Sequence, residues 1–205
     1  MKQKRTFADK CLAASMIVFI ALLPFVATGC NSTEVVQDTV NVLNQVQGYV
    51  GTARALLPEL QTLNPVLAQQ VDEYTALASG NVANLITVGN AYLSSPSGDK
   101  YQNILNGIDA LTATVDAKVL AVAKVTNPAS QAKVLAVLTV ISVSLHAILT
   151  TLKAKASKTQ MKSMSAISAR VSLDQIKPYL DLDYAREKIA ESGRSPEVVL
   201  WAAGL

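Results

Sequence analysis

The chain has 205 residues, of which 50% are hydrophobic and only 5% aromatic, and its 18 basic and 15 acidic residues give a net charge of +3. A single histidine excludes metal sites built from several imidazoles. The length suffices for one domain with its own core. Strict alternation of apolar and polar residues is not sustained anywhere, whereas three- and four-residue spacings are common, so the sequence predicts helices.

Residues 1–29 have the three parts of a secretory signal. An uncharged apolar stretch runs over residues 12–26, and small residues follow it directly before Cys30. The basic residues that precede this stretch are Lys2, Lys4, Arg5 and Lys10. We expect this segment to be cleaved and to take no part in the fold.

The run Ala27-Thr28-Gly29-Cys30 resembles the lipobox of bacterial lipoproteins, with Ala27 where most members carry Leu. The resemblance implies a lipidated N-terminus over residues 30–32, with acyl chains such as palmitate on Cys30. It also implies a membrane-anchored protein of the bacterial cell envelope that faces the periplasm, or the outside of a single-membraned cell. Asn31 in place of Asp favours the outer membrane. The alternatives are an ordinary signal peptide that leaves Cys30 a free thiol, and an uncleaved anchor.

Cleavage changes the charge balance. The signal contains four bases and one acid, which leaves 14 of each in a neutral mature chain, and this gives no support to nucleic-acid binding. The charges are unevenly placed, because residues 117–173 hold eight bases and no acid. Either this stretch packs against acidic helices in an antiparallel arrangement, or it forms a basic surface that faces anionic head groups.

Helix boundaries can be predicted through residue 98. Apolar residues recur every three or four positions from residue 33, which predicts a helix that Pro58 limits. Gly48 and Gly51 should weaken its middle or allow close packing. Asn64-Pro65 predicts a second helix, which we expect to end at Ser79-Gly80. Asn81 should cap a third helix, and a loop should follow over residues 94–98.

A longer helix is expected next, and Asn127-Pro128 should end it. Its inward-facing residues are predicted to be Tyr101, Ile104, Ile108, Leu111, Val115, Val119 and Val122. Short connections between such helices indicate an up-and-down arrangement. The expected fold is therefore an all-α bundle of about five to seven helices, with its core over residues 33–153.

Residues 134–152 carry no charge and are bordered by Lys133 and Lys153. This segment is long enough to cross a bilayer. Four of its residues share one helix face, however, and form a possible polar stripe: Thr139, Ser142, His146 and Thr150. A lone lipid-exposed span has no use for such a stripe, which favours the central helix of a bundle. A membrane span and an interfacial helix remain the alternatives.

The last part of the chain is predicted to pack on the bundle. Residues 154–171 have few large apolar side chains and suggest a basic linker or exposed helix. Within the C-terminal segment 172–205, Ser172 and Gln175 fit a capping box. Helices are expected over residues 182–192 and from Ser195-Pro196. We expect Trp201 to dock the last helix on the bundle, with a membrane-interface or partner-binding aromatic as the alternative.

The sequence contains no Gly-x-Ser-x-Gly elbow and no phosphate-binding glycine loop. We therefore expect no enzyme activity and no catalytic residue, metal or cofactor. The favoured function is a lipid-anchored helical interaction or scaffold protein, with the membrane as one partner and a protein, which the sequence does not identify, as another. The alternatives are a membrane-active or membrane-spanning protein that uses residues 134–152, and a carrier of apolar ligands.

Overall fold

The computed structural model describes residues 32–156 and 171–205. Within these ranges all regular structure is helical, which confirms the predicted all-α bundle with a long apolar helix. The cleavage-site residues Ala27, Thr28 and Gly29, the lipidation candidate Cys30 and most of the 154–171 linker lie outside the described residues.

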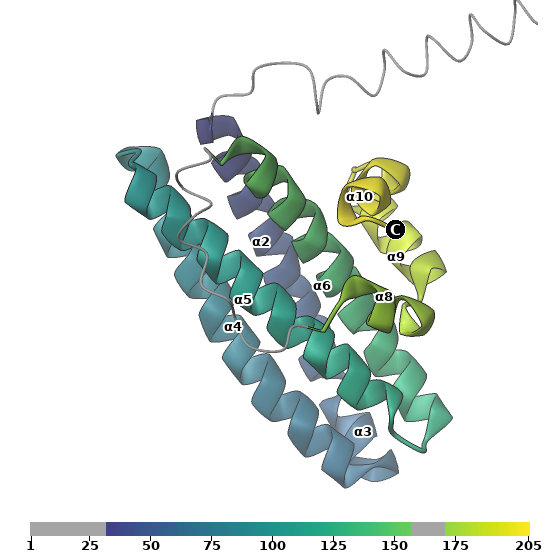
Figure 1. Cartoon of the computed structure of the whole chain (residues 1–205). Helices are drawn as coiled ribbons and strands as arrows, with labels where there is room; N and C mark the ends of the chain where they lie inside the picture. Colours follow the sequence, from purple (N-terminus) through teal and green to yellow (C-terminus); the bar gives the residue numbers. More distant parts are fainter. Residues whose placement is uncertain (1–31, 157–170) are drawn as a thin grey trace, which may run out of the picture. The chain divides into compact units, whose positions relative to one another are not determined.

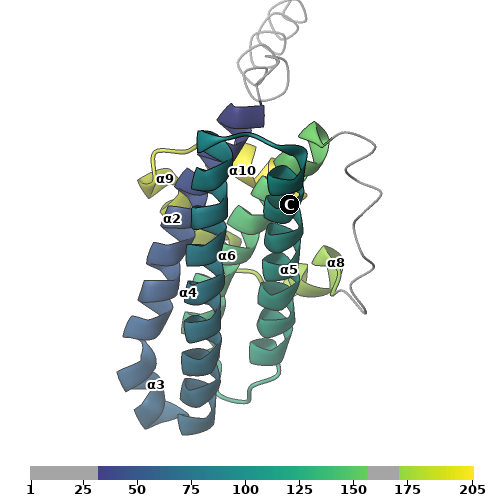
Figure 2. The same ribbon diagram turned by 90° about the vertical axis from the view of Figure 1, so that its left-hand side faces the viewer.

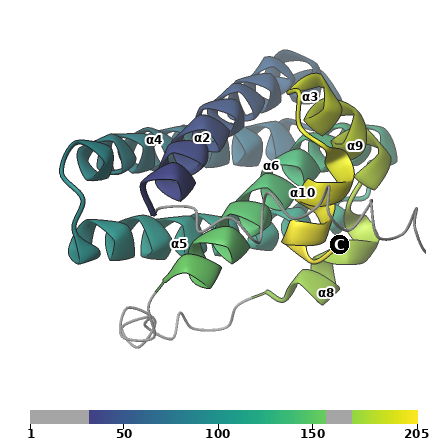
Figure 3. The same cartoon turned by 90° about the horizontal axis from the view of Figure 1, so that it is seen from above.

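Four long helices form the bundle (Figure 1). They are α2 (Ser32–Ala55), α4 (Pro65–Ser94), α5 (Gly98–Ala123) and α6 (Pro128–Lys155). Each packs against two others, because α2 and α5 both contact α4 and α6. Figure 3, which looks at the bundle from above, shows these neighbours side by side. The short helix α3 (Leu57–Leu63) follows α2 and lies against α4.

Side-chain caps start three of the long helices where the sequence places a polar residue. The backbone N–H of Leu67 donates to Asn64 Oδ1 (3.1 Å), and that of Ser130 donates to Asn127 Oδ1 (3.2 Å). Ser97 caps α5 in the same way. Proline follows both asparagines, at a position where the helix needs no N–H donor.

The core lies between the four long helices. All the residues predicted to face inward from α5 are buried. Helix α6 is the most enclosed element, since it buries almost every residue from Val137 to Leu149. Removing these aliphatic side chains from water contributes about 1.5–3 kcal/mol each, which makes the shared core the main source of stability.

The predicted helix end at Ser79-Gly80 and the predicted cap at Asn81 are both wrong, because α4 continues through these residues to Ser94. Ala78 and Val82 are buried on either side of Gly80. A glycine inside a helix costs only about 1 kcal/mol, which is less than the burial of these neighbours contributes. Tertiary packing therefore carries the helix across this position.

Two other glycines mark the close contacts between helices. A Cβ on Gly89 of α4 would lie 2.5 Å from Val40 Cγ2 of α2, and one on Gly107 of α5 would meet Leu85 of α4. By contrast, Gly48 and Gly51 face open space, so the suggestion that they allow close packing is wrong.

The C-terminal segment forms short helices that pack on the bundle. These are α8 (Leu173–Ile176), a 3-10 turn η2 (Lys177–Tyr179), α9 (Leu182–Glu191) and α10 (Pro196–Ala203). Helices α9 and α10 contact α6, and α8 contacts α5 (Figure 2). The capping box of Ser172 and Gln175 is present. Gly193 follows α9 with a φ of 77°, a conformation that glycine adopts without strain.

Trp201 does not dock α10 on the bundle, so this prediction is wrong. The residue is 71% exposed, whereas its neighbours Val199, Leu200 and Ala203 are buried. These three belong to the same cluster as Val140 of α6. An eight-residue helix buries one face only, and the small and aliphatic face of α10 is the one that fits against α6.

Candidate functional site

The polar stripe of α6 lies mostly inside the bundle. Thr139 and Ser142 are fully buried, and the side chain of His146 is 18% exposed. Thr150 is exposed and lies outside the buried set. A buried polar group without a hydrogen-bond partner costs about 1–3 kcal/mol. Thr139, Ser142 and His146 therefore need hydrogen-bond partners inside the protein.

Asp116 of α5 joins two of these residues. The hydroxyl of Ser142 donates to Asp116 Oδ1 over 2.9 Å, and His146 Nε2 lies 2.9 Å from Asp116 Oδ2. Asp116 is only 2% exposed. The two carboxylate oxygens therefore each have a partner from the facing helix, which offsets the cost of removing the carboxylate from water.

A second polar pair lies two turns away on the same two helices. Lys153 Nζ of α6 lies 3.3 Å from Asp109 Oδ1 of α5, and Asp109 is 4% exposed. Asp109 and Asp116 are seven residues apart, as are His146 and Lys153, and the two helices run antiparallel. Both pairs therefore belong to a single register of α5 against α6.

Thr139 connects α6 to the C-terminal segment. Its hydroxyl donates to the carbonyl of Leu135 (2.7 Å) and accepts from the backbone N–H of Asp181 (3.0 Å). Asp181 is the N-cap of α9. This contact fixes the start of α9 on the surface of α6.

Tyr74 of α4 is buried beside the Asp116 group. Its hydroxyl makes no hydrogen bond within the described part of the chain. Burial is the main cause that raises the pKa of Tyr74, and the negative charge of Asp116 raises it further. Lys118 Nζ lies 5.8 Å from the centre of the Tyr74 ring, within the range of a cation–π contact.

The order of these groups differs from that of a nucleophilic triad. In a triad the imidazole stands between the hydroxyl and the carboxylate and takes the hydroxyl proton. Here the carboxylate of Asp116 stands between Ser142 and His146. Over residues 32–156 and 171–205, no group of three or more potential metal ligands occurs either. The arrangement can hold two helices in register, but it does not activate Ser142.

Asp109 and Asp116 are the residues that sequence reasoning missed. They stand on the inner face of α5, next to Ile108 and Val115. Carboxylates at a spacing of seven on an apolar face, together with His146 and Lys153 at the same spacing, are the signal that could have predicted the pairs.

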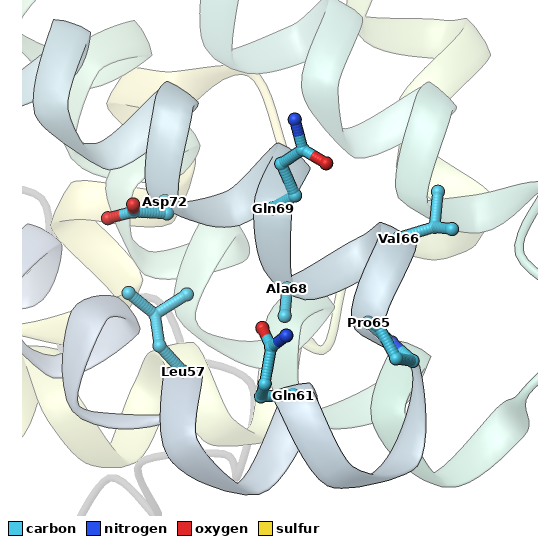
Figure 4. A pocket seen from close by; sticks show the side chains of 7 residues that line it. All are labelled: Leu57, Gln61, Pro65, Val66, Ala68, Gln69 and Asp72. Carbon is cyan, nitrogen blue, oxygen red and sulfur yellow. The ribbon is translucent and has the colours of Figure 1, made fainter.

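The structure also has open hollows on its surface. One of about 460 Å³ lies between α3 and α4 (Figure 4) and is lined by Leu57, Gln61, Pro65, Val66, Ala68, Gln69 and Asp72. Another of about 370 Å³ is lined by Ser32, Tyr92, Pro96, Ser97, Gly98, Tyr101 and Lys155. Both mix polar and apolar side chains.

Within the described residues, α6 is the one helix long and apolar enough to cross a membrane. In the bundle, 78% of the most apolar 18-residue stretch of α6 is buried. Comparison with known proteins finds no family model, no curated protein and no solved structure that matches this chain.

Proposed function

We propose that this protein is a lipid-anchored, non-enzymatic interaction or scaffold module of the bacterial cell envelope. The main support for the proposal is that the helical bundle follows the lipobox-like sequence almost directly. A sequence that resembles a lipobox ends at Cys30, and the first helix of the bundle begins at Ser32. Such a chain is a helical domain held at a membrane by acyl chains, two of which suffice for stable attachment.

The burial of α6 supports a lipid rather than this helix as the anchor. Its apolar surface packs mainly against other helices. To enter a bilayer, α6 would have to leave Asp109 and Asp116 behind or bring them into lipid, and a charged side chain at the membrane centre costs about 2.5–3.5 kcal/mol even on the lowest scale. The proposal therefore places α6 in the bundle and the acyl chains in the membrane.

The contacts of the buried polar residues support a scaffold role. Ser142, His146 and Thr139 are hydrogen-bonded to other parts of the same chain. These side chains hold helices together, and the described hollows have no cluster of acid, base and nucleophile. A rigid bundle with such an interior acts through its surface.

Acylation is tested by metabolic labelling with an alkyne analogue of palmitate, followed by fractionation with an alkaline wash. Wild-type protein should incorporate the label and stay with the membranes, and Cys30→Ala should lose the label. Cys11→Ala is the matched control, because Cys11 lies within the predicted signal, and it should behave as the wild type. Incorporation of the label by Cys30→Ala, or its absence from the wild type, would refute the proposal.

A form that begins at Ser32 tests the membrane-spanning alternative, since residues 32–205 make up a compact unit. We expect this form to remain in the soluble fraction as a monodisperse species. If it pellets with membranes or releases dye from liposomes, α6 is membrane-active and the interaction-module proposal is wrong.

A further inference from the structure

We propose that the end of the bundle that contains Ser32 lies against the head-group layer of the bilayer, and that α3 marks the membrane-distal end. The inference rests on the proposed acylation of Cys30. We define the anchor end as Ser32, the α4–α5 connection with Pro96, and the last turn of α6 with Lys155. The occupant of this surface is the layer of phospholipid head groups.

The tether between Cys30 and the bundle is short. Cys30 precedes Ser32 by two residues, and two peptide units span at most about 7 Å in any conformation. Acyl chains on Cys30 lie in the hydrocarbon core, so their attachment point lies at the head groups. The first turn of α2 must then be at or beside the membrane surface.

A chain of side-chain contacts connects Ser32 to the other three long helices. The hydroxyl of Tyr92 of α4 donates to Ser32 Oγ over 2.8 Å. The rings of Tyr92 and Tyr101 of α5 meet edge to face, with centroids 5.9 Å apart. The Tyr101 hydroxyl donates to the carbonyl of Leu152 of α6 over 2.8 Å. All four helices are therefore connected at the anchor end, which leaves α2 little freedom to bend away from the bundle.

The anchor end carries hydroxyl groups and charged side chains. The hollow of about 370 Å³ at this end is lined in part by Ser32, Ser97 and Lys155. Lys100 Nζ donates to the carbonyls of Ala91 and Ser95, which keeps a second positive charge close to the surface. Glu34 and Asp99 add negative charges in the first turns of α2 and α5. Hydroxyls and charges of both signs suit the phosphate and amine groups of phospholipids.

The opposite end lies far from the tether. Helix α2 has 24 residues, which corresponds to about 36 Å at 1.5 Å per residue. Helix α3 follows at its far end, where Glu59 pairs with Lys133 of α6. Leu63 and Val66 are 46% and 68% exposed at this end. The tether therefore directs α3 and the α3–α4 hollow away from the membrane, where a second protein could reach them.

The test uses the mature acylated protein, which begins at Cys30, in vesicles of phosphatidylethanolamine and phosphatidylglycerol that contain a lipid with a nitroxide on its head group. A fluorophore is attached to a new cysteine at one of two exposed positions, Pro96→Cys at the anchor end or Gln61→Cys on α3. Neither substitution removes a helix cap or a core side chain. We expect loss of fluorescence from the label at position 96 and retention at position 61.

The outcomes separate the two proposals. Wild-type protein with acylated Cys30 offers no thiol, so it should not react with a maleimide fluorophore. If it reacts and carries no acyl chain, the proposed function fails and this inference fails with it. If Cys30 is acylated but the label at position 61 is quenched as much as that at position 96, or more, the orientation alone is refuted.

Discussion

Asp116 and His146, which are 30 residues apart in the chain, meet at 2.9 Å between α5 and α6. The same carboxylate accepts a hydrogen bond from the hydroxyl of Ser142. Asp109 and Lys153 form a second pair two turns away. A helix as apolar as α6 could slide along its neighbours at little cost in hydrophobic burial. These polar contacts favour one alignment, because any other would leave buried charges without partners.

Replacing Asp116 by alanine should therefore destabilise the bundle strongly. The substitution leaves Ser142 and His146 without their acceptor, and each buried polar group left without a partner costs about 1–3 kcal/mol. Urea unfolding followed by circular dichroism measures the effect. Asp72→Ala is the control, since its pair with Arg54 is 3.6 Å long and the two side chains are 58% and 50% exposed. This substitution should cost about 1 kcal/mol or less. Equal losses from the two substitutions would contradict the role given to Asp116.

Alanine substitutions at two helical glycines should have opposite effects on stability. A Cβ at Gly89 would meet Val40 at 2.5 Å, so Gly89→Ala should lower the free energy of unfolding by about 1–3 kcal/mol. Gly48 faces open space on α2, and Gly48→Ala should raise it by about 0.5–1 kcal/mol. Thermal and urea unfolding of both variants provide the comparison. A stabilised Gly89→Ala variant would show that α2 and α4 are further apart than described.

Two buried tyrosines should make the fold sensitive to alkaline pH. Burial, with a smaller contribution from Tyr92, raises the pKa of Tyr101 from 10.0 to about 12, and burial also raises that of Tyr74. Between pH 10 and about pH 12, the folded state keeps the Tyr101 proton that the unfolded chain has released. Stability is therefore complete below pH 10 and is lost as the pH rises towards 12.

Urea unfolding at a series of alkaline pH values tests this, with phenolate absorbance as a second measurement. Tyr101→Phe should show a smaller loss of stability than the wild type over the same pH range. A wild-type stability that stays constant up to pH 12 would contradict the raised pKa values.

The hydroxyl groups of the same two tyrosines should differ in their contribution at neutral pH. The Tyr101 hydroxyl donates to the Leu152 carbonyl, so Tyr101→Phe should cost about 0.5–1.5 kcal/mol. The Tyr74 hydroxyl is buried without a hydrogen bond in the part of the chain that the structure describes. Tyr74→Phe should therefore be neutral or stabilising, and its unfolding midpoint is the deciding measurement. A loss as large as that of Tyr101→Phe would show that Tyr74 has a partner.

Trp201 should report an exposed environment in the folded protein. As the sole tryptophan of the chain and 71% exposed, it should be quenched by acrylamide nearly as well before unfolding as after it. Trp201→Ala should change stability by no more than about 0.5 kcal/mol. Leu200→Ala is the matched control on the same helix, and it should cost about 2–5 kcal/mol because Leu200 is buried. A protected tryptophan would mean that α10 is turned on its axis.

Much of the secondary structure could be predicted because its signals are local. The apolar spacing of α5, the asparagine and proline that begin α4 and α6, and the end of α9 at Gly193 all appear within a few neighbouring residues. The continuity of α4 through Gly80 could not be predicted, because it depends on the packing of α2 against α4. Trp201 was misplaced for a related reason, since only the shape of α6 decides which face of α10 is buried.

By itself, the sequence determined the helical class, the start of α4 at Asn64-Pro65 and the existence of an uncharged helix with a polar face. It also contains the signal-like segment and Cys30 on which the proposed anchoring depends. Only the tertiary structure decided that Asp109 and Asp116 face that helix, that Thr150 lies outside the buried set, and that Ser32, Tyr92 and Tyr101 connect the helices at one end. Caps and periodicity arise from interactions between near neighbours in the chain, whereas these contacts join residues 30 to 60 positions apart and depend on how the helices pack.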